Sequence, residues 1–281
     1  MTDAISFDTI SADVPMLLVP ATAGDGEPLT VVVDTGATPP FPLIVSEALA
    51  KRLGLSLEAG ETEATPAIGP RPPTLRKTQV PRFTMGPISL SDVPAIATEA
   101  VDRLAASIGR PVDAIVGHAF LKELTFSVDY GAKLIDFTAA PGADSEAISF
   151  TLGPKKPVMV VTATVNGKGP FAMELDTGAM ASSATPKLAE QAAIDVRGSG
   201  RMSGPGGDIP VHYGHASVGF AGRTAEAQQF AISEAIERIA QETGAPIEGI
   251  IGARFFAGTR VTIAYPDGKM WVEPSGGADA P

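Results

Sequence analysis

The chain has 281 residues, of which 44% are hydrophobic, and a formal net charge of −11 at pH 7. This length and apolar content allow one large domain or two ordinary ones and exclude global disorder. The acidic charge would repel a phosphate backbone, so we expect no nucleic-acid partner. The lack of cysteine excludes disulfides, thiol catalysis and zinc sites that need thiolate ligands.

Taken in chain order, the first half predicts a hairpin, a short helix, further strands and a second helix. An Asp-Gly turn at 25–26 joins two apolar strands, and the second strand ends at Asp34. Apolar residues four apart predict a helix over 46–53. After a Gly- and Pro-rich stretch and more strands, a helix is expected over roughly 98–108. Gly109 stands at the position that commonly ends a helix.

The second half predicts the same elements in the same order. An Asn-Gly dipeptide at 166–167 is a strong hairpin signal. Thr185 is a suitable N-cap for a short helix, because Pro186 follows at the first helical position. A longer helix is expected over 233–243, and Gly244 stands where it should end. Each half closes with an apolar strand and a further hairpin.

The strand before Asp176 alternates between two faces. Phe171, Met173 and Leu175 should point to one face, with Ala172 and Glu174 on the other. From this alternation we expect Glu174 to be solvated.

The two halves also share sequence. Residues 31–37, Val-Val-Val-Asp-Thr-Gly-Ala, recur as Met-Glu-Leu-Asp-Thr-Gly-Ala at 173–179, and residues 110–117 recur at 245–252. The period is too long for a solenoid, so it indicates a duplicated domain. A polar, Pro- and Gly-containing stretch marks the boundary between the copies. The predicted parts are a first lobe of residues 1–140, a linker of residues 141–147 and a second lobe of residues 148–281.

With two Asp-Thr-Gly tripeptides, each after an alternating strand and before a helix, the sequence resembles the pepsin and retropepsin superfamily of aspartic proteases. The resemblance spans about residues 14–272, and the chain is similar to bacterial retropepsin-like proteins that fuse two such units. It implies a mainly β fold of two homologous β-barrel lobes related by pseudo-twofold symmetry. It also implies an aspartic endopeptidase that hydrolyses a polypeptide substrate with water activated between two aspartates.

The resemblance assigns roles residue by residue. Asp34 and Asp176 would be the catalytic pair, sharing one proton and requiring neither metal nor cofactor. The hydroxyl groups of both threonines would bond across the axis between the lobes. The supporting residues are Thr35, Gly36, Thr177 and Gly178 in the loops, and Ile115, Val116, Gly117, Ile250, Ile251 and Gly252 in the strands packed behind them. Since one chain holds both half-sites, we expect a monomer.

Two Gly-containing stretches match the flaps that cover substrate in this superfamily. They cover roughly 62–74 and 200–211, and their candidate glycines are Gly69, Gly204, Gly206 and Gly207. The alternative is a pair of surface hairpins without this role. The first stretch is rich in proline and lacks the tyrosine of pepsin-like flaps, and Tyr213 near the second is a candidate substitute.

Further features bear on activity. Ala37 and Ala179 cannot donate a side-chain hydrogen bond to the carboxylates, so we expect a pH optimum less acidic than that of pepsin. Met180 breaks the symmetry with Thr38. The alternative function is therefore a non-catalytic module that binds a peptide or ligand on the same fold.

The remaining expectations concern metals and location. His212 and His215 lie in a predicted strand, where residues three apart face opposite sides, so we expect no metal site there. No apolar stretch is long enough to span a bilayer. Residues 1–11 carry no export signal. The expected location is the periplasm or the exterior if the chain has been trimmed, and the cytoplasm otherwise.

Overall fold

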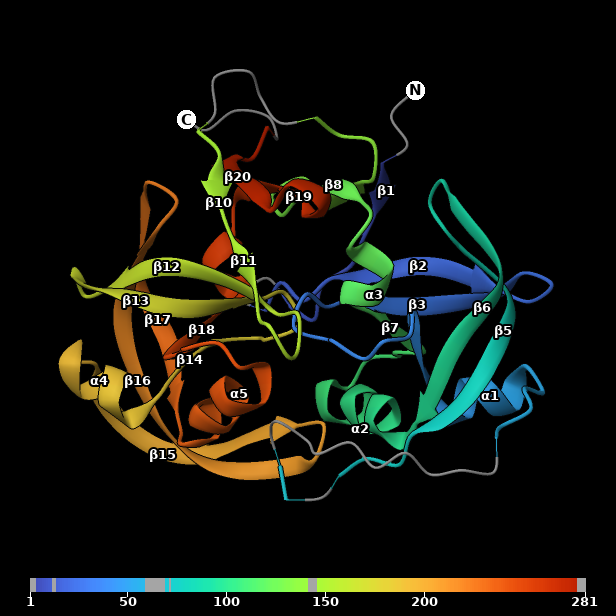
Figure 1. The fold of residues 1–281 in the computed structure, drawn as a ribbon, viewed down its shortest axis with the longest axis horizontal. Coiled ribbons are helices and arrows are strands. Elements are labelled where there is room, and N and C mark those ends of the chain that lie inside the picture. Colours follow the sequence, from blue (N-terminus) through green and yellow to red (C-terminus); the bar gives the residue numbers. More distant parts are fainter. Residues whose placement is uncertain (1–3, 12–13, 59–68, 71, 141–145, 277–281) are drawn as a thin grey trace.

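The computed structural model describes residues 4–11, 14–58, 69–70, 72–140 and 146–276, and its described part is mainly β (Figure 1). Two lobes lie side by side in this view, and a sheet formed by both of them runs across the top. The expected fold class is confirmed: the first lobe contains a closed barrel and the second a broad, curved sheet.

The barrel of the first lobe has the strand order β2-β3-β7-β4-β6-β5. Strand β3 pairs in parallel with β7, and β7 pairs antiparallel with β4, so the end of β3 lies inside the sheet. The strands are β2 (Leu18–Ala23), β3 (Glu27–Val33), β4 (Leu43–Ser46), β5 (Arg76–Met85), β6 (Ile88–Thr98) and β7 (Ala114–Val116). The helices are α1 (Glu47–Arg52), α2 (Glu99–Ile108) and α3 (His118–Leu121).

The second lobe repeats this arrangement in a sheet of order β11-β12-β13-β18-β14-β17-β16-β15. Here β13 pairs in parallel with β18, as β3 does with β7. The strands are β11 (Thr151–Leu152), β12 (Met159–Val165), β13 (Lys168–Asp176), β14 (Ser182–Ala184), β15 (Asp195–Gly204), β16 (Gly207–Phe220), β17 (Arg223–Ile232) and β18 (Gly249–Gly252). The helices are α4 (Pro186–Gln191), α5 (Ala235–Thr243) and the 3-10 turn η1 (Ala253–Phe256).

The sheet between the lobes has the order β1-β9-β8-β19-β20-β10. Its strands are β1 (Ile5–Ser6), β8 (Thr125–Asp129), β9 (Leu134–Asp136), β10 (Ile148–Ser149), β19 (Thr259–Ala264) and β20 (Lys269–Pro274), with the turn η2 (Tyr265–Asp267) before β20. The seam between the lobes is the antiparallel pair β8–β19. The lobe boundaries at 140 and 148 stay a prediction, and most of the proposed linker lies outside the described residues.

The helix predictions from sequence are confirmed by the caps. The Ser46 hydroxyl accepts a hydrogen bond from the Leu49 amide at the start of α1, and Thr185 does the same for the Leu188 amide at the start of α4. Gly109 ends α2 with a φ of 64°, a left-handed conformation that favours glycine. Side-chain capping therefore defines where α1 and α4 begin, and glycine defines where α2 ends.

Apolar side chains fill each lobe and also the layer between its sheet and its longer helix. One cluster lies between the first barrel and α2, and its buried members are Met16, Leu18, Val32, Ile44, Ile96, Val101 and Val112. Its counterpart under α5 contains Val158, Ile236, Ile239, Ala245, Ile247 and Ile250. The strands that end at Asp34 and Asp176 are thus held from both faces.

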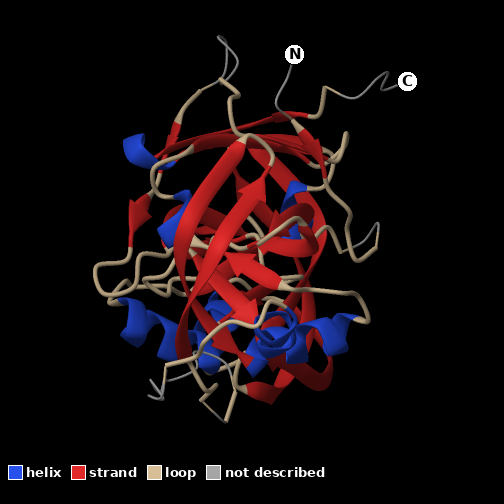
Figure 2. Cartoon of the chain, turned by 90° about the vertical axis from the view of Figure 1, so that its right-hand side faces the viewer, coloured by secondary structure: helices blue, strands red, loops and turns tan. Residues whose placement is uncertain are grey.

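A view from the side places the longer helices at the end of the molecule opposite the sheet between the lobes (Figure 2). Strands run along the whole height in this view. Within the described ranges, no helix is both long and apolar enough to cross a membrane.

Replacing Phe126 tests how much the sheet between the lobes contributes to the stability of the fold. Its side chain is 1% exposed and its ring lies 6.4 Å from that of Tyr265, which belongs to the other half of the chain. We expect Phe126→Ala to lower the free energy of unfolding by about 3–5 kcal/mol, because it leaves a cavity. Urea denaturation followed by circular dichroism measures this. Leu152→Ala, at a half-exposed site, is the control, and an equal loss in both variants would contradict the prediction.

Candidate active site

The two Asp-Thr-Gly loops meet where β3 and β13 end, at the centre of the molecule. A methyl group placed on Gly36 would lie 2.6 Å from Cγ of Asp176, and one placed on Gly178 would lie 2.4 Å from Cγ of Asp34. Each glycine therefore stands against the carboxyl group of the opposite loop, and no other residue type fits there without displacing it. The two candidate aspartates face each other because of this close approach.

Backbone amides orient each carboxyl group in the same way. Asp34 Oδ1 accepts hydrogen bonds from the amides of Gly36, at 2.8 Å, and Ala37, at 3.0 Å. Asp176 Oδ1 accepts them from Gly178, at 2.7 Å, and Ala179, at 3.1 Å. The carboxyl groups also hydrogen-bond each other. One oxygen of each aspartate is thus held by its own loop.

The two threonines connect the loops in a crossed pattern. Thr35 Oγ1 donates to the carbonyl of Leu175 at 2.9 Å and accepts from the amide of Thr177 at 3.1 Å. Thr177 Oγ1 donates to the carbonyl of Val33 at 2.8 Å and accepts from the amide of Thr35 at 3.1 Å. Both side chains are buried. The contacts run between lobes, where the sequence resemblance placed them.

The strands behind the loops lie at the positions proposed for them. The amide of Asp34 donates to the carbonyl of Val116 at 3.0 Å. A methyl group on Gly117 would lie 2.1 Å from the carbonyl oxygen of Ala37, and one on Gly252 would lie 2.6 Å from that of Ala181. These glycines allow the loop to pack directly on the strand. The other strand residues proposed are Ile115, Ile250 and Ile251, in β7 and β18.

Both aspartates have a raised pKa. Burial is the main cause for Asp34, and the nearby charge of Asp176 raises its pKa further, well above the ordinary value. Burial also raises the pKa of Asp176, while its hydrogen bonds to Asp34 and to backbone amides act in the opposite direction. Two carboxyl groups this close cannot both ionise cheaply, so the pair holds a proton between them.

Glu174 contradicts the expectation that it is solvated. Its side chain is 3% exposed, and its Oε2 has no hydrogen-bond partner among the described residues. Burial raises the pKa of Glu174 well above its usual value, and the charges of Asp176 and Asp34 add to this effect. The side chains of β13 alternate between two faces as predicted, but α5 covers the face of Glu174, which was expected to be in solvent. Sequence reasoning missed this residue, although the buried Val32 at the matching place could have indicated it.

The second candidate flap is the hairpin of β15 and β16. Gly204 pairs with Gly207 at its tip, and Gly206 lies between them. A methyl group on Gly69 would lie 2.1 Å from the carbonyl carbon of Gly206, so the two flap stretches touch. Residues 62–68 and 71 of the first stretch lie outside the described residues.

Helix α2 connects the two flap stretches. Arg103 donates to the carbonyl of Pro205, in the tip of the second hairpin, at 2.5 Å. Arg103 also pairs with Glu99 at 3.0 Å, and Glu99 accepts a hydrogen bond from the amide of Thr74 at 3.2 Å. The first lobe therefore holds the tip of a hairpin that belongs to the second.

Other residues singled out from sequence make contacts outside the pair of aspartates. The Tyr213 hydroxyl donates to the carbonyl of Arg201 within the hairpin, at 2.7 Å. Met180 is 38% exposed beside the second loop. His212 contacts the Ser199 hydroxyl at 2.9 Å. No group of three or more potential metal ligands occurs in the part of the chain that the structure describes.

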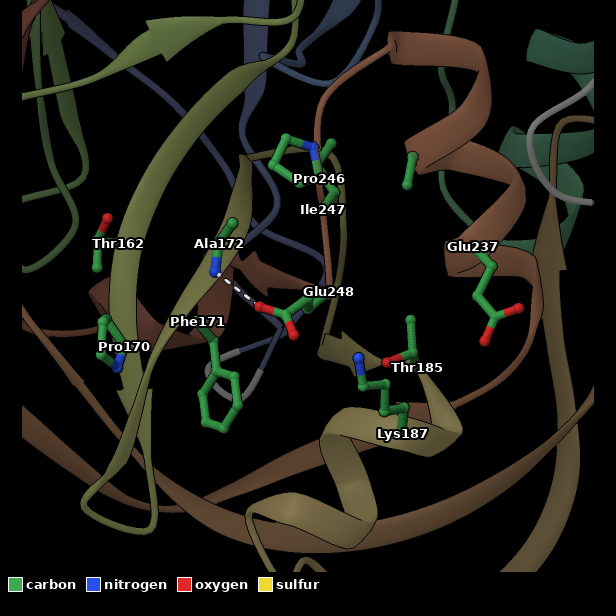
Figure 3. Close-up of a pocket in the computed structure, with 11 residues that line it drawn as sticks. Thr162, Pro170, Phe171, Ala172, Thr185, Lys187, Glu237, Pro246, Ile247 and Glu248 are labelled. Carbon is green, nitrogen blue, oxygen red and sulfur yellow. Dashed lines mark hydrogen bonds between the residues drawn. The ribbon is translucent and has the colours of Figure 1, made fainter.

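A hollow on the second lobe lies apart from the two aspartates (Figure 3). It lies between the start of β13, α4 and α5, and neither Asp34 nor Asp176 lines it. The Glu248 carboxylate there accepts a hydrogen bond from the Ala172 amide at 3.2 Å. In the first lobe, Asp113 accepts one from the Thr30 amide at 2.9 Å. Both acidic residues fix the strand that leads to an Asp-Thr-Gly loop.

Two lobes with facing Asp-Thr-Gly loops define a retropepsin-like aspartic protease architecture. A family model described as aspartyl protease matches residues 19–120 and 161–255, one region in each lobe. The chain belongs to the aspartyl protease family. No curated protein matches it.

Removing the hydroxyl from one threonine should loosen the link between the loops. In Thr35→Val, the amide of Thr177 loses its acceptor and the carbonyl of Leu175 loses its donor. We expect the free energy of unfolding to fall by about 1–3 kcal/mol, since these groups stay buried. Urea denaturation measures the loss. Thr35→Ser keeps the hydroxyl and should recover most of it, and equal losses in both variants would count against the crossed bonds.

Proposed function

We propose that this protein is an aspartic endopeptidase, with Asp34 and Asp176 as its catalytic pair. The observation that carries the proposal is the contact of each Asp-Thr-Gly loop with the carboxyl group of the other. Membership of the aspartyl protease family supports a hydrolase of this kind. The substrate proposed is a polypeptide, bound in the space between the lobes.

The reaction follows from the shared proton. The ionised carboxylate takes a proton from a water molecule, whose oxygen attacks the carbonyl carbon of the peptide bond. The protonated carboxyl group donates a hydrogen bond and then its proton to the developing oxyanion. As the diol collapses, the carboxyl group that took the proton from water gives it to the leaving nitrogen, and the other carboxylate takes a proton back from a diol hydroxyl. The C–N bond then breaks, and the pair again holds one proton.

The remaining candidate residues support this chemistry without touching the reacting atoms. Thr35 and Thr177 keep the loops in register, while Gly36 and Gly178 allow the carboxyl groups to meet. Water exclusion is assigned to the hairpin tip around Gly204, Gly206 and Gly207, together with Gly69. Both half-sites lie in one chain, which supports action as a monomer.

The catalytic pair is tested by replacing each aspartate alone. We expect Asp34→Asn and Asp176→Asn each to lower kcat/KM by at least about 100-fold, because either change removes one partner of the proton exchange. The assay is cleavage of a denatured protein from acid to neutral pH, with products identified by mass spectrometry.

Asp25→Asn is the matched control, because Asp25 lies in an exposed turn. It should cleave like the wild type. An inert wild type at every pH would overturn the protease proposal and would favour a groove that only binds a peptide. Activity retained in either loop variant would exclude the shared pair.

Ala37 and Ala179 provide a test of the pH dependence. A serine hydroxyl at either position would donate to the adjacent carboxylate, favour the ionised form and lower the pKa of the pair. We therefore expect Ala37→Ser and Ala179→Ser to move the whole pH–rate profile toward acid. Profiles of kcat/KM measure the shift. The wild type should work best at a pH less acidic than pepsin's, and a serine variant that moves the profile toward alkali would contradict the explanation.

A further inference from the structure

Glu174 occupies a place that the first lobe gives to an apolar residue. When the Asp-Thr-Gly loops are matched, Glu174 corresponds to Val32, two residues before the aspartate. Val32 is fully buried in the cluster beneath α2. Glu174 is 97% buried at the matching place beneath α5, so a carboxyl group replaces a valine in an otherwise similar layer.

The surroundings of Glu174 are apolar. It lies opposite Val160 on one neighbouring strand and Ile250 on the other. Both belong to the cluster that packs against Ile236 and Ile239 of α5. Oε2 finds no hydrogen-bond partner in the described residues. An unpaired carboxylate in such a layer would cost several kcal/mol, whereas a protonated carboxyl group costs much less.

The charged groups around Glu174 do not relieve this cost. Those that act on its charge are Asp176 and Asp34, both acidic. On α5, Glu237 and Arg238 are exposed, and Glu242 pairs with Lys156. Glu248, before β18, is engaged with the amide of Ala172, and within their described bounds β12 and β18 carry no ionisable side chain. Burial and both aspartates together raise the pKa of Glu174 well above its ordinary value.

The same cluster reaches the catalytic loop. Ala179, whose amide donates to Asp176, packs on the cluster that Ile236 and Ile239 form beneath α5. Leu175 alone separates Glu174 from Asp176 along β13. A change in the packing of α5 on β13 would therefore move the loop that orients Asp176.

We propose that Glu174 is a positioning residue for Asp176 that keeps its proton while the protein is active, and whose ionisation at higher pH loosens α5 and displaces the second loop. The part of this proposal that concerns activity rests on the proposed proteolysis. The part that concerns stability does not.

The direction of the pH dependence follows from proton binding. The folded protein keeps a proton on Glu174 at pH values where the unfolded chain has lost it. The stability contributed by the neutral group is complete below the unfolded pKa of about 4.3 and declines as pH rises toward the higher folded pKa. The wild type should thus lose stability across this window to a greater extent than a variant without the carboxyl group.

The test compares Glu174→Gln, which keeps the shape without ionising near neutral pH, with Glu174→Val, which installs the residue of the first lobe. Melting temperatures are measured from about pH 4, near the unfolded pKa of glutamate, up to about pH 9. Across this range the melting temperature of the wild type should fall, relative to both variants, by about 3–5 °C for each unit by which folding raises the pKa of Glu174. Hydrogen exchange in α5 should speed up with pH, beyond the chemical rate, in the wild type and in neither Glu174 variant.

Glu190→Gln removes a carboxylate from an exposed site of the same lobe and should follow the wild type. Melting curves that run parallel in all four proteins would overturn the role of Glu174, whether or not the protein cleaves peptides. Activity is measured separately. Both Glu174 variants should keep their kcat to a higher pH than the wild type does, with KM little changed. If no protein cleaves while the melting curves diverge, the protease proposal fails and the pH-dependent packing stands.

Discussion

The crossed hydrogen bonds of Thr35 and Thr177 are the constraint on which the rest of the site depends. Each threonine satisfies backbone groups of the opposite loop, so neither loop is complete without the other lobe. These bonds oppose the repulsion between two carboxyl groups brought into contact. The sheet between the lobes and the packed strands behind the loops keep the threonines in reach of each other. The loops that they join bury Asp34 beside Asp176, and burial, with the nearby charge of Asp176 as a second cause, raises the pKa of Asp34.

Local signals predicted much of this fold because they act over a few residues. Two helices begin at the caps that the sequence indicated, Ser46 and Thr185. Two others end at the glycines that it indicated, Gly109 and Gly244. The repeat indicated a duplicated domain, and the resemblance to aspartic proteases carried by its Asp-Thr-Gly tripeptides implied that the two loops meet. The same reasoning failed for Glu174, because alternation along a strand gives the two faces but not what covers each. The bond from Arg103 to Pro205 joins residues far apart in sequence, and no local pattern indicates it.

Duplication has left the lobes unequal. Glu174 in the second lobe corresponds to Val32 in the first, and Met180 corresponds to Thr38. The hairpin of β15 and β16 belongs to the second lobe, but the first lobe holds its tip. Symmetry thus builds the site, and departures from symmetry distinguish its two sides.

The order of strands between the lobes bears on how such a chain could arise. Each half contributes a contiguous block, β1-β9-β8 from the first and β19-β20-β10 from the second, and the blocks meet only along β8 and β19 in this described sheet. Within each block, the first strand of the half pairs with its last. Each half is therefore closed on itself, and the covalent connection between them is topologically dispensable. If two copies of one such half first formed a homodimer and were later joined by gene fusion, no strand would have had to change its pairing partners.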